Sequence, residues 1–181
     1  MSQTLVQKVE ALEKKVEQLQ NQRKDQLSMV VFSNDMDKIL AALVIAIGAA
    51  AMDTEVKLFF TFWAISALRD KNKKAKGKDF KSKMFGTMLP RGVDQLKLSK
   101  LNMEGLGKDM MKGIMKNKKV ASLGEMLATA GELGIQIDIC EMSMELMGFR
   151  KDEMIDYPNL GYCGVATFLA DAGESSIQLF I

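Results

Sequence analysis

Histidine is absent from this 181-residue chain, and cysteine occurs only twice. Without histidine, the chain cannot form a Ser-His-Asp triad or a Cys-His catalytic pair. Two cysteines are too few for a closed zinc site of Cys and His ligands, and too few for a disulfide framework. An enzyme built from this sequence must therefore activate its nucleophile with backbone dipoles, with Lys or Arg, or with a partner.

Signals for membranes, secretion and nucleic acid are also missing. The uninterrupted apolar stretch, residues 39–52, is too short to span a bilayer, and the N-terminus does not resemble a signal peptide. Together with the scarcity of cysteine, this leads us to expect a reducing, cytoplasmic setting. A net charge of only +2 makes no case for nucleic-acid binding.

The composition is that of one globular domain preceded by a separate helix. The chain is 48% hydrophobic and 27% charged, and its length suits one sizeable core better than two domains. We expect residues 1–25 to form an N-terminal helix and residues 26–181 to form a single α/β domain. Residues 70–119 are a Lys- and Met-rich insertion within that domain.

Apolar residues in the N-terminal segment recur at alternating spacings of four and three. They are Leu5, Val9, Leu12, Val16 and Leu19. With Lys, Glu and Gln between them, they form the narrow a/d seam of a parallel coiled coil, with Val at a and Leu at d. A helix this short is marginal alone and needs a partner. We favour an oligomerising coil, and the alternative is a helix lying on its own domain.

Strand-like and helix-like segments alternate in the first half of the domain. Residues 27–35 are a short apolar strand that ends in helix-starting residues, and residues 36–53 form a helix with little polar surface. Residues 55–62 are the next strand, rich in aromatic and β-branched side chains. Strand, helix and strand make a βαβ unit, so the two strands should be parallel.

The alternation returns near the C-terminus. Ser122 and Glu125 form a capping box that begins a helix over residues 122–134, and Gly134 suits its end. We then expect a strand at 135–140, a short helix at 142–148, a last helix at 159–173 and a terminal strand at 175–181. This order predicts an open, mostly parallel sheet with helices on both faces.

The insertion begins with a basic run. Residues 69–83 carry eight basic and two acidic residues. A solvated helix end running into a loop is the favoured interpretation, and a docking patch for an acidic partner or a membrane surface is the alternative. Residues 84–119 have no clean period, which is typical of a lid or an interface. Their methionines either line an adaptable apolar surface or simply pack.

Cys140 ends the third strand, just before a short helix. In open α/β sheets, ligands bind beyond the carboxyl ends of the strands, and helix N–H groups there favour a thiolate. Ser143 stands at a C-x-x-S spacing, with its hydroxyl within reach of the sulfur. Against activation, Asp138, Glu141 and Glu145 are negative neighbours, and free cysteine is often a small buried hydrophobe. Both interpretations remain open.

Cys163 falls on the predicted last helix, among glycine and alanine residues. Small residues there indicate tight packing, so we interpret Cys163 as a packing residue. If residues 156–161 bring it beside Cys140, it would instead be a resolving thiol.

Three stretches carry a family resemblance. "AALVIAIGAAAMDTEVKLFFTFWAISALR" (41–69), "ICEMSMELMGF" (139–149) and "GVATFLADA" (164–172) together resemble the DsrE/DsrF-like sulfur-relay family, in a branch sometimes labelled peroxiredoxin-like. The chain lacks the Thr/Pro-Cys arrangement with a nearby Arg that a peroxiredoxin uses. The resemblance covers residues 27–181. It implies a flavodoxin-like α/β fold, a homo-oligomer, and a cysteine that carries sulfur as a persulfide or thiosulfonate.

In that resemblance, the sulfur-carrying cysteine matches Cys140, whereas Cys163 matches no part of the family motif. Persulfide transfer needs little acid–base machinery, so a site without histidine is acceptable, and we expect no cofactor and no metal. Ser143, together with Asn34 at the end of the first strand, should face the same crevice. Phe62 and Trp63 end the second strand and either wall this crevice or pack in the core.

Three hypotheses follow. The leading one is a sulfur carrier or sulfurtransferase in which Cys140 passes sulfane sulfur to a thiol on a partner protein. The second is a non-catalytic oligomeric adaptor of a sulfur or redox system, with a buried, unreactive Cys140. The third is a thiol redox protein that forms a disulfide between Cys140 and Cys163. We do not expect binding to nucleic acid or to a membrane surface.

Overall fold

Five parallel strands form one open sheet. The computed structural model describes residues 2–21, 24–73, 84 and 86–181. The strands are β1 (Lys24–Val31), β2 (Glu55–Phe60), β3 (Gln136–Cys140), β4 (Leu160–Cys163) and β5 (Ser175–Phe180), in the spatial order β4-β3-β2-β1-β5. Each adjacent pair is parallel, so all carboxyl ends lie at one edge. The predicted open, flavodoxin-like α/β architecture is confirmed.

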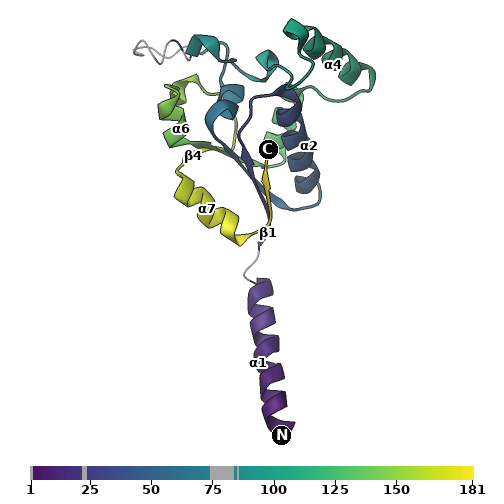
Figure 1. Ribbon diagram of the computed structural model, residues 1–181, viewed down its shortest axis with the longest axis vertical. Helices are drawn as coiled ribbons and strands as arrows, with labels where there is room; N and C mark the ends of the chain where they lie inside the picture. The colour runs from purple at the N-terminus through teal and green to yellow at the C-terminus, as the bar shows by residue number, and fades with distance from the viewer. Residues whose placement is uncertain (1, 22–23, 74–83, 85) are drawn as a thin grey trace.

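Helices cover both faces of this sheet. The helices α2 (Met36–Ala50) and α5 (Leu123–Glu132) lie on one side, which we call the α2 face, and α7 (Val165–Glu174) lies on the other, the α7 face (Figure 1). The short helix α6 (Glu141–Leu146) follows β3 at the carboxyl edge. Successive strand residues point to opposite faces, so each strand serves both layers.

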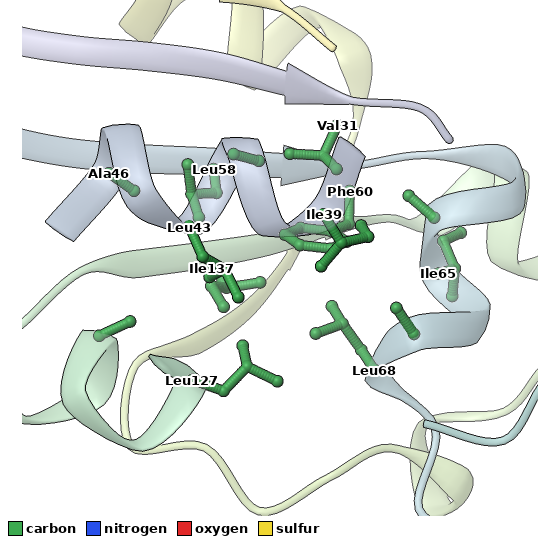
Figure 2. Close-up of a cluster of buried hydrophobic side chains, with 14 of the residues drawn as sticks. Val31, Ile39, Leu43, Ala46, Leu58, Phe60, Ile65, Leu68, Leu127 and Ile137 are labelled. Atoms are coloured by element: carbon green, nitrogen blue, oxygen red, sulfur yellow. The ribbon is translucent and has the colours of Figure 1, made fainter. Parts of the chain in front are cut away.

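The main core lies on the α2 face. Alternate strand residues Leu58, Phe60 and Ile137 project into it and are at most 1% exposed. They meet Ile39 and Leu43 of α2, and Leu127 of α5 closes the layer (Figure 2). Burying each such side chain stabilises the fold by about 1.5–3 kcal/mol. The apolar alternation of the strands therefore places most of the hydrophobic stabilisation on this side.

Local signals set the ends of α5. The Ser122 hydroxyl accepts from the Glu125 backbone N–H, and the Glu125 carboxylate accepts from the Ser122 N–H, so the predicted capping box is present. Gly134, just beyond the helix, has φ +76°, a left-handed conformation that favours glycine.

The predicted last helix over residues 159–173 begins too early in the sequence. Residues 160–163 form strand β4 alongside β3, and the helix α7 begins only at Val165, after Gly164 at its N-cap. The four residues carry little apolar alternation, and the edge of β3 supplies the backbone partners that make them a strand. Tertiary pairing decided this segment, which sequence propensity had left ambiguous.

The insertion contains more regular structure than its sequence suggested. Helix α4 (Leu106–Asn117) lies within residues 84–119, where no clean period was recognised (Figure 1). Arg69, expected at the start of a solvated basic run, is instead 1% exposed and bonded to Glu153 at 3.0 Å. Residues 74–83, most of the basic run for which a docking patch was the alternative interpretation, lie outside the described residues.

The N-terminal helix α1 (Ser2–Asn21) stands apart from the sheet, beyond the amino ends of the strands (Figure 1). Its seam residues Val9, Leu12 and Val16 are all at least half exposed. Its helical state agrees with the heptad spacing, whereas its pairing with a second helix stays a prediction. Among the described residues, no helix is both long enough and apolar enough to cross a membrane.

Candidate functional site

Cys140 is the last residue of β3, and its side chain lies on the α7 face. It is 0% exposed and packs in a small cluster with Phe59, Phe168 and Ala172. The rings of Phe59 and Phe168 stack at 4.6 Å between centroids, which ties α7 to β2 beside the thiol. Its place at the carboxyl edge agrees with the sequence, but its sulfur is covered rather than open to solvent.

A chain of two hydroxyls leads to the Cys140 sulfur. The Ser143 hydroxyl donates to Cys140 Sγ at 3.3 Å, so the C-x-x-S spacing does bring the two side chains together. The Thr61 hydroxyl lies 2.8 Å from the Ser143 hydroxyl. Ser143 has one O–H, so when it donates to the sulfur its oxygen accepts from the Thr61 hydroxyl. A chain of donors pointing at sulfur stabilises negative charge there.

Thr61 was missed in the sequence. It directly follows β2, the strand next to β3, and it is 9% exposed. Since neighbouring parallel strands end at the same edge, the residue after one strand lies near the end of the next. The sequence could have indicated Thr61 by this argument. The predicted second strand runs through residue 62, however, which makes Thr61 a strand residue rather than the residue that follows the strand.

Cys163 is the register partner of Cys140. β3 and β4 are parallel, and their last residues, the two cysteines, pair directly. Both side chains lie on the α7 face, where Cys163 packs against the cluster that contains Cys140. Both thiols are free, and Cys163 is partly exposed. The placement of Cys163 on a helix is therefore wrong, and the condition set for a resolving thiol, a position beside Cys140, is met.

The surroundings of Cys163 disfavour its thiolate. Burial raises the pKa of the Cys163 thiol to about 11, and the negative charges of Asp138, Asp171 and Glu141 and the neighbouring Cys140 add to the rise. Desolvation and nearby negative charge both act against the ionised form. Cys163 is therefore a neutral thiol at neutral pH.

Asp138 is held over β4 in a fixed position. Its carboxylate accepts a hydrogen bond from Gln136 Nε2 at 3.0 Å. It lies above Gly161, where a Cβ atom would overlap the Asp138 carboxylate oxygen. The absence of a side chain at Gly161 thus leaves room for the Asp138 carboxylate to lie over β4. The same carboxylate contributes to the negative charge around Cys163.

The helix after Cys140 is shorter than a strong helix dipole requires. α6 spans six residues and carries Glu141 in its first turn, where that carboxylate pairs with Lys151 at 2.9 Å. The dipole effect acts through the first turn and weakens in a helix this short. The hydrogen bond from Ser143 is therefore the better-defined polar contact at the Cys140 sulfur.

The other predicted site residues lie at the same edge of the sheet but in separate surroundings. Asn34 donates to the Ser66 hydroxyl at 3.1 Å and lines a cavity of about 430 Å³ against residues 87–90. Phe62 packs on Phe32 with 5.6 Å between ring centroids, and its φ of 46° is left-handed, which is unusual for an aromatic residue. Trp63 is 41% exposed.

Both Phe62 and Trp63 belong to the 3-10 helix η1 (Phe62–Leu68) rather than to β2, which ends at Phe60. Cys140 is not among the residues that line the Asn34 cavity. The structure therefore brings Thr61, Ser143, Cys140 and Cys163 together, while Asn34 serves a neighbouring cavity.

Arg69 fixes the start of the insertion at the carboxyl edge. Its guanidinium pairs with Glu153 and donates to the Gly86 carbonyl at 3.1 Å, and it lies 4.6 Å from the centre of the Phe149 ring. Burial lowers the pKa of the Arg69 guanidinium, and Glu153 opposes that shift. The residue anchors the chain that frames the Asn34 cavity.

Known proteins similar to this chain cover nearly all of the α/β domain. A model of the DsrE/DsrF/DrsH-like family matches residues 23–180. The chain is 46% identical to the uncharacterized protein YrkE of Bacillus subtilis (strain 168), over 85% of this chain and 95% of that protein. It is 33% identical to the sulfur carrier protein DsrE2 of Allochromatium vinosum, over 86% of this chain and 97% of that protein.

A solved structure shares the fold. The crystal structure of the YchN protein from E. coli superposes with a TM-score of 0.53 at 11% identity, covering 86% of this chain and 98% of that chain.

Proposed function

Because the chain belongs to the DsrE/DsrF/DrsH-like family, we propose that it carries sulfane sulfur on Cys140 and passes it to a thiol of a partner protein. One observation of the site carries this proposal: a cysteine at the carboxyl edge receives a hydrogen bond from Ser143, which is in turn linked to Thr61. The relative named as a sulfur carrier supports the same role. A cytoplasmic setting, where thiols stay reduced, suits this chemistry.

The proposed transfer consists of two thiol exchange steps. The Cys140 thiolate attacks the sulfane sulfur of a donor, a new S–S bond forms, and the donor leaves as its own anion. Attack by a partner thiolate on the outer sulfur then returns Cys140 to the thiolate. Ser143 and Thr61 stabilise the charge on Cys140 at the start and at the end. No histidine is needed, because no step requires a general base inside the site.

Access to Cys140 requires its cover to move. The helix α7 buries only Phe168 and Ala172. Two ion pairs with partly exposed partners add to its attachment, Lys24 to Glu174 at 2.5 Å and Lys57 to Asp171 at 3.1 Å, and pairs of this kind contribute little stability. Such a lightly attached helix belongs to the parts of a fold that open locally at low free energy. We assign to α7 the role of the cover that admits donor and partner.

Self-association through α1 completes the proposal. In the heptad register set by Val9, Leu12 and Val16, Lys8 falls at a g position and Glu13 at the e position five residues on. In a parallel pair of helices, Lys8 of one chain faces Glu13 of the other, whereas an antiparallel pair brings like charges together. The exposed seam and this charge pattern favour a parallel homo-oligomer.

A second candidate function is a non-catalytic adaptor in a sulfur or redox system. The complete burial of Cys140 favours it, since a core cysteine acts as a small hydrophobe. The two functions differ in whether Cys140 reacts in the native protein.

Cyanide-releasable sulfur tests the leading proposal. The reduced protein is incubated briefly with inorganic polysulfide, desalted and assayed, and the loaded residue is located by mass spectrometry. We expect loading on Cys140, complete loss of loading in Cys140→Ser, and retained loading in the matched control Cys163→Ser. Loading that survives Cys140→Ser would remove Cys140 from the site. A native protein that never loads, with a Cys140 that is alkylated only after unfolding, would favour the adaptor.

A further inference from the structure

The two cysteines of the chain end neighbouring strands at directly paired positions. Adjacent strands lie about 4.7–4.9 Å apart, which is inside the Cα separation of about 4.4–6.8 Å that a disulfide spans. Both side chains lie on the α7 face and pack in one cluster beneath Phe168. The geometry therefore allows a bond between the two sulfurs without rearranging the sheet.

We propose a further activity for this pair: Cys163 discharges the sulfur held on Cys140 when no partner removes it, releasing sulfide and leaving a Cys140–Cys163 disulfide. This inference rests on the proposed function, because it requires sulfur on Cys140. It makes the site both a carrier and a slow sulfide-releasing reductase of sulfane sulfur.

The step balances without an outside oxidant. The Cys163 thiolate attacks the Cys140 sulfur of the persulfide, and the bond between the two cysteines forms as the bond to the outer sulfur breaks. The outer sulfur leaves as hydrosulfide and is reduced by two electrons. The two cysteine sulfurs supply those electrons as they become a disulfide, and the Cys163 proton goes to solvent. A small dithiol reductant returns both residues to thiols.

The charges around Cys163 make this discharge slow. Burial first, and then Asp138 on β3, Cys140, Asp171 on α7 and Glu141 on α6, raise the pKa of Cys163 to about 11. Lys57 faces Asp171 and offsets part of that residue's charge. Little Cys163 is ionised at neutral pH, so sulfur on Cys140 persists long enough to be transferred. Below its pKa, the thiolate fraction of Cys163 should rise about tenfold per pH unit. The discharge rate should rise with it over the pH range in which the outer sulfur of the persulfide stays protonated, because that sulfur leaves as hydrosulfide.

The test follows both products after loading. Reduced wild type, Cys163→Ser and Cys163→Ala receive one equivalent of inorganic polysulfide, are desalted, and are followed at several pH values. Sulfide release and intact mass under non-reducing conditions are the readouts. We expect wild type to gain the mass of one sulfur atom and then to release that sulfur as sulfide. Its final mass should be lower than that of the reduced protein by the two thiol hydrogens, and sulfide release should be faster at higher pH. Both variants should keep the added sulfur.

Each alternative result identifies what has failed. The discharge proposal is overturned if wild type keeps its sulfur as long as the variants do. It is also overturned if the disulfide joins two chains rather than two cysteines of one chain. Either result leaves the carrier proposal standing. Absence of added sulfur on Cys140 in all three proteins overturns the proposed function and the discharge together. The wild-type mass and its pH dependence decide the question even if a variant folds poorly.

Discussion

The two faces of the sheet differ in what they bury. On the α2 face, two helices cover strand residues that are apolar, such as Leu58 and Ile137, in one continuous core (Figure 2). On the α7 face, a single helix covers a small cluster that contains both cysteines and two stacked rings. Each strand thus contributes one set of alternate residues to the main core and the other set to the small cluster around Cys140.

Polar groups are buried on the α7 face and satisfy one another. Gln26 donates to the Ser28 and Ser175 hydroxyls at 3.1 and 2.9 Å, and those two hydroxyls lie 2.7 Å apart. Buried polar groups are tolerated only when they are hydrogen-bonded, so this network takes positions that apolar residues would otherwise fill. The α7 layer therefore gains less hydrophobic stabilisation per residue than the α2 layer.

This difference indicates a division of labour. A reactive thiol needs a cover that can open, whereas the strands that position it must not move. In the function we propose, the larger apolar layer on the α2 face holds β2 and β3 in place, and the smaller cluster on the α7 face allows α7 to move away from Cys140. Substitutions on the two faces should therefore have separable effects.

The largest effect on stability should come from Phe60→Ala on the α2 face. Phe60 is 1% exposed in the main core, and truncation leaves a cavity there. We expect the free energy of unfolding, from urea denaturation, to fall by about 3–5 kcal/mol. A loss below about 1 kcal/mol would mean that this face is not the stabilising layer.

Phe168→Ala should have a smaller effect on stability and a large one on reactivity. The ring is 9% exposed and covers Cys140 from a lightly attached helix, so we expect a loss of about 2 kcal/mol. If the substitution lowers the free energy of local opening of α7 by this amount, Cys140 should be alkylated roughly 30-fold faster in the native protein. Leu169→Ala, at a 60% exposed position of the same helix, is the matched control and should change neither quantity. An unchanged alkylation rate in Phe168→Ala would exclude α7 as the cover.

The smallest of the three expected effects is a slower rate of sulfur loading in Ser143→Ala, which changes the residue beside the Cys140 thiol. The substitution removes the hydrogen bond to Cys140 Sγ and should cost about 1 kcal/mol of charge stabilisation, or roughly a fivefold slower sulfur loading. Thr61→Ser keeps the hydroxyl that supports Ser143 and should load at the wild-type rate. Equal loading rates for wild type and Ser143→Ala would show that the hydroxyl chain does not stabilise the thiolate.

Much of the architecture was readable from the sequence because its signals are local. The capping box at Ser122, the glycine at 134 and the alternation of strands and helices each depend on residues close together in the chain. The position of Cys140 at the carboxyl end of a strand follows from the same alternation. The short strand β4 and the buried Arg69 were missed, because their partners lie far away in sequence.

The site itself was only half visible. The spacing of Ser143 from Cys140 is a local feature, and the contact exists. Thr61, which follows β2, and Cys163, the last residue of β4, lie beside Ser143 and Cys140. No spacing along the chain predicts these contacts, because they depend on the order of the strands in the sheet.

Taken alone, then, the sequence determined the order of most strands and helices, the heptad seam of α1, the exclusion of histidine chemistry and the cysteine at a strand end. Only the tertiary structure decided that Cys163 stands beside Cys140, that Thr61 supports Ser143, and that α7 covers the thiol. The physical reason is the range of the forces involved. Helix caps and hydrophobic periodicity act over a few residues, whereas strand neighbours and burial depend on how the whole sheet assembles.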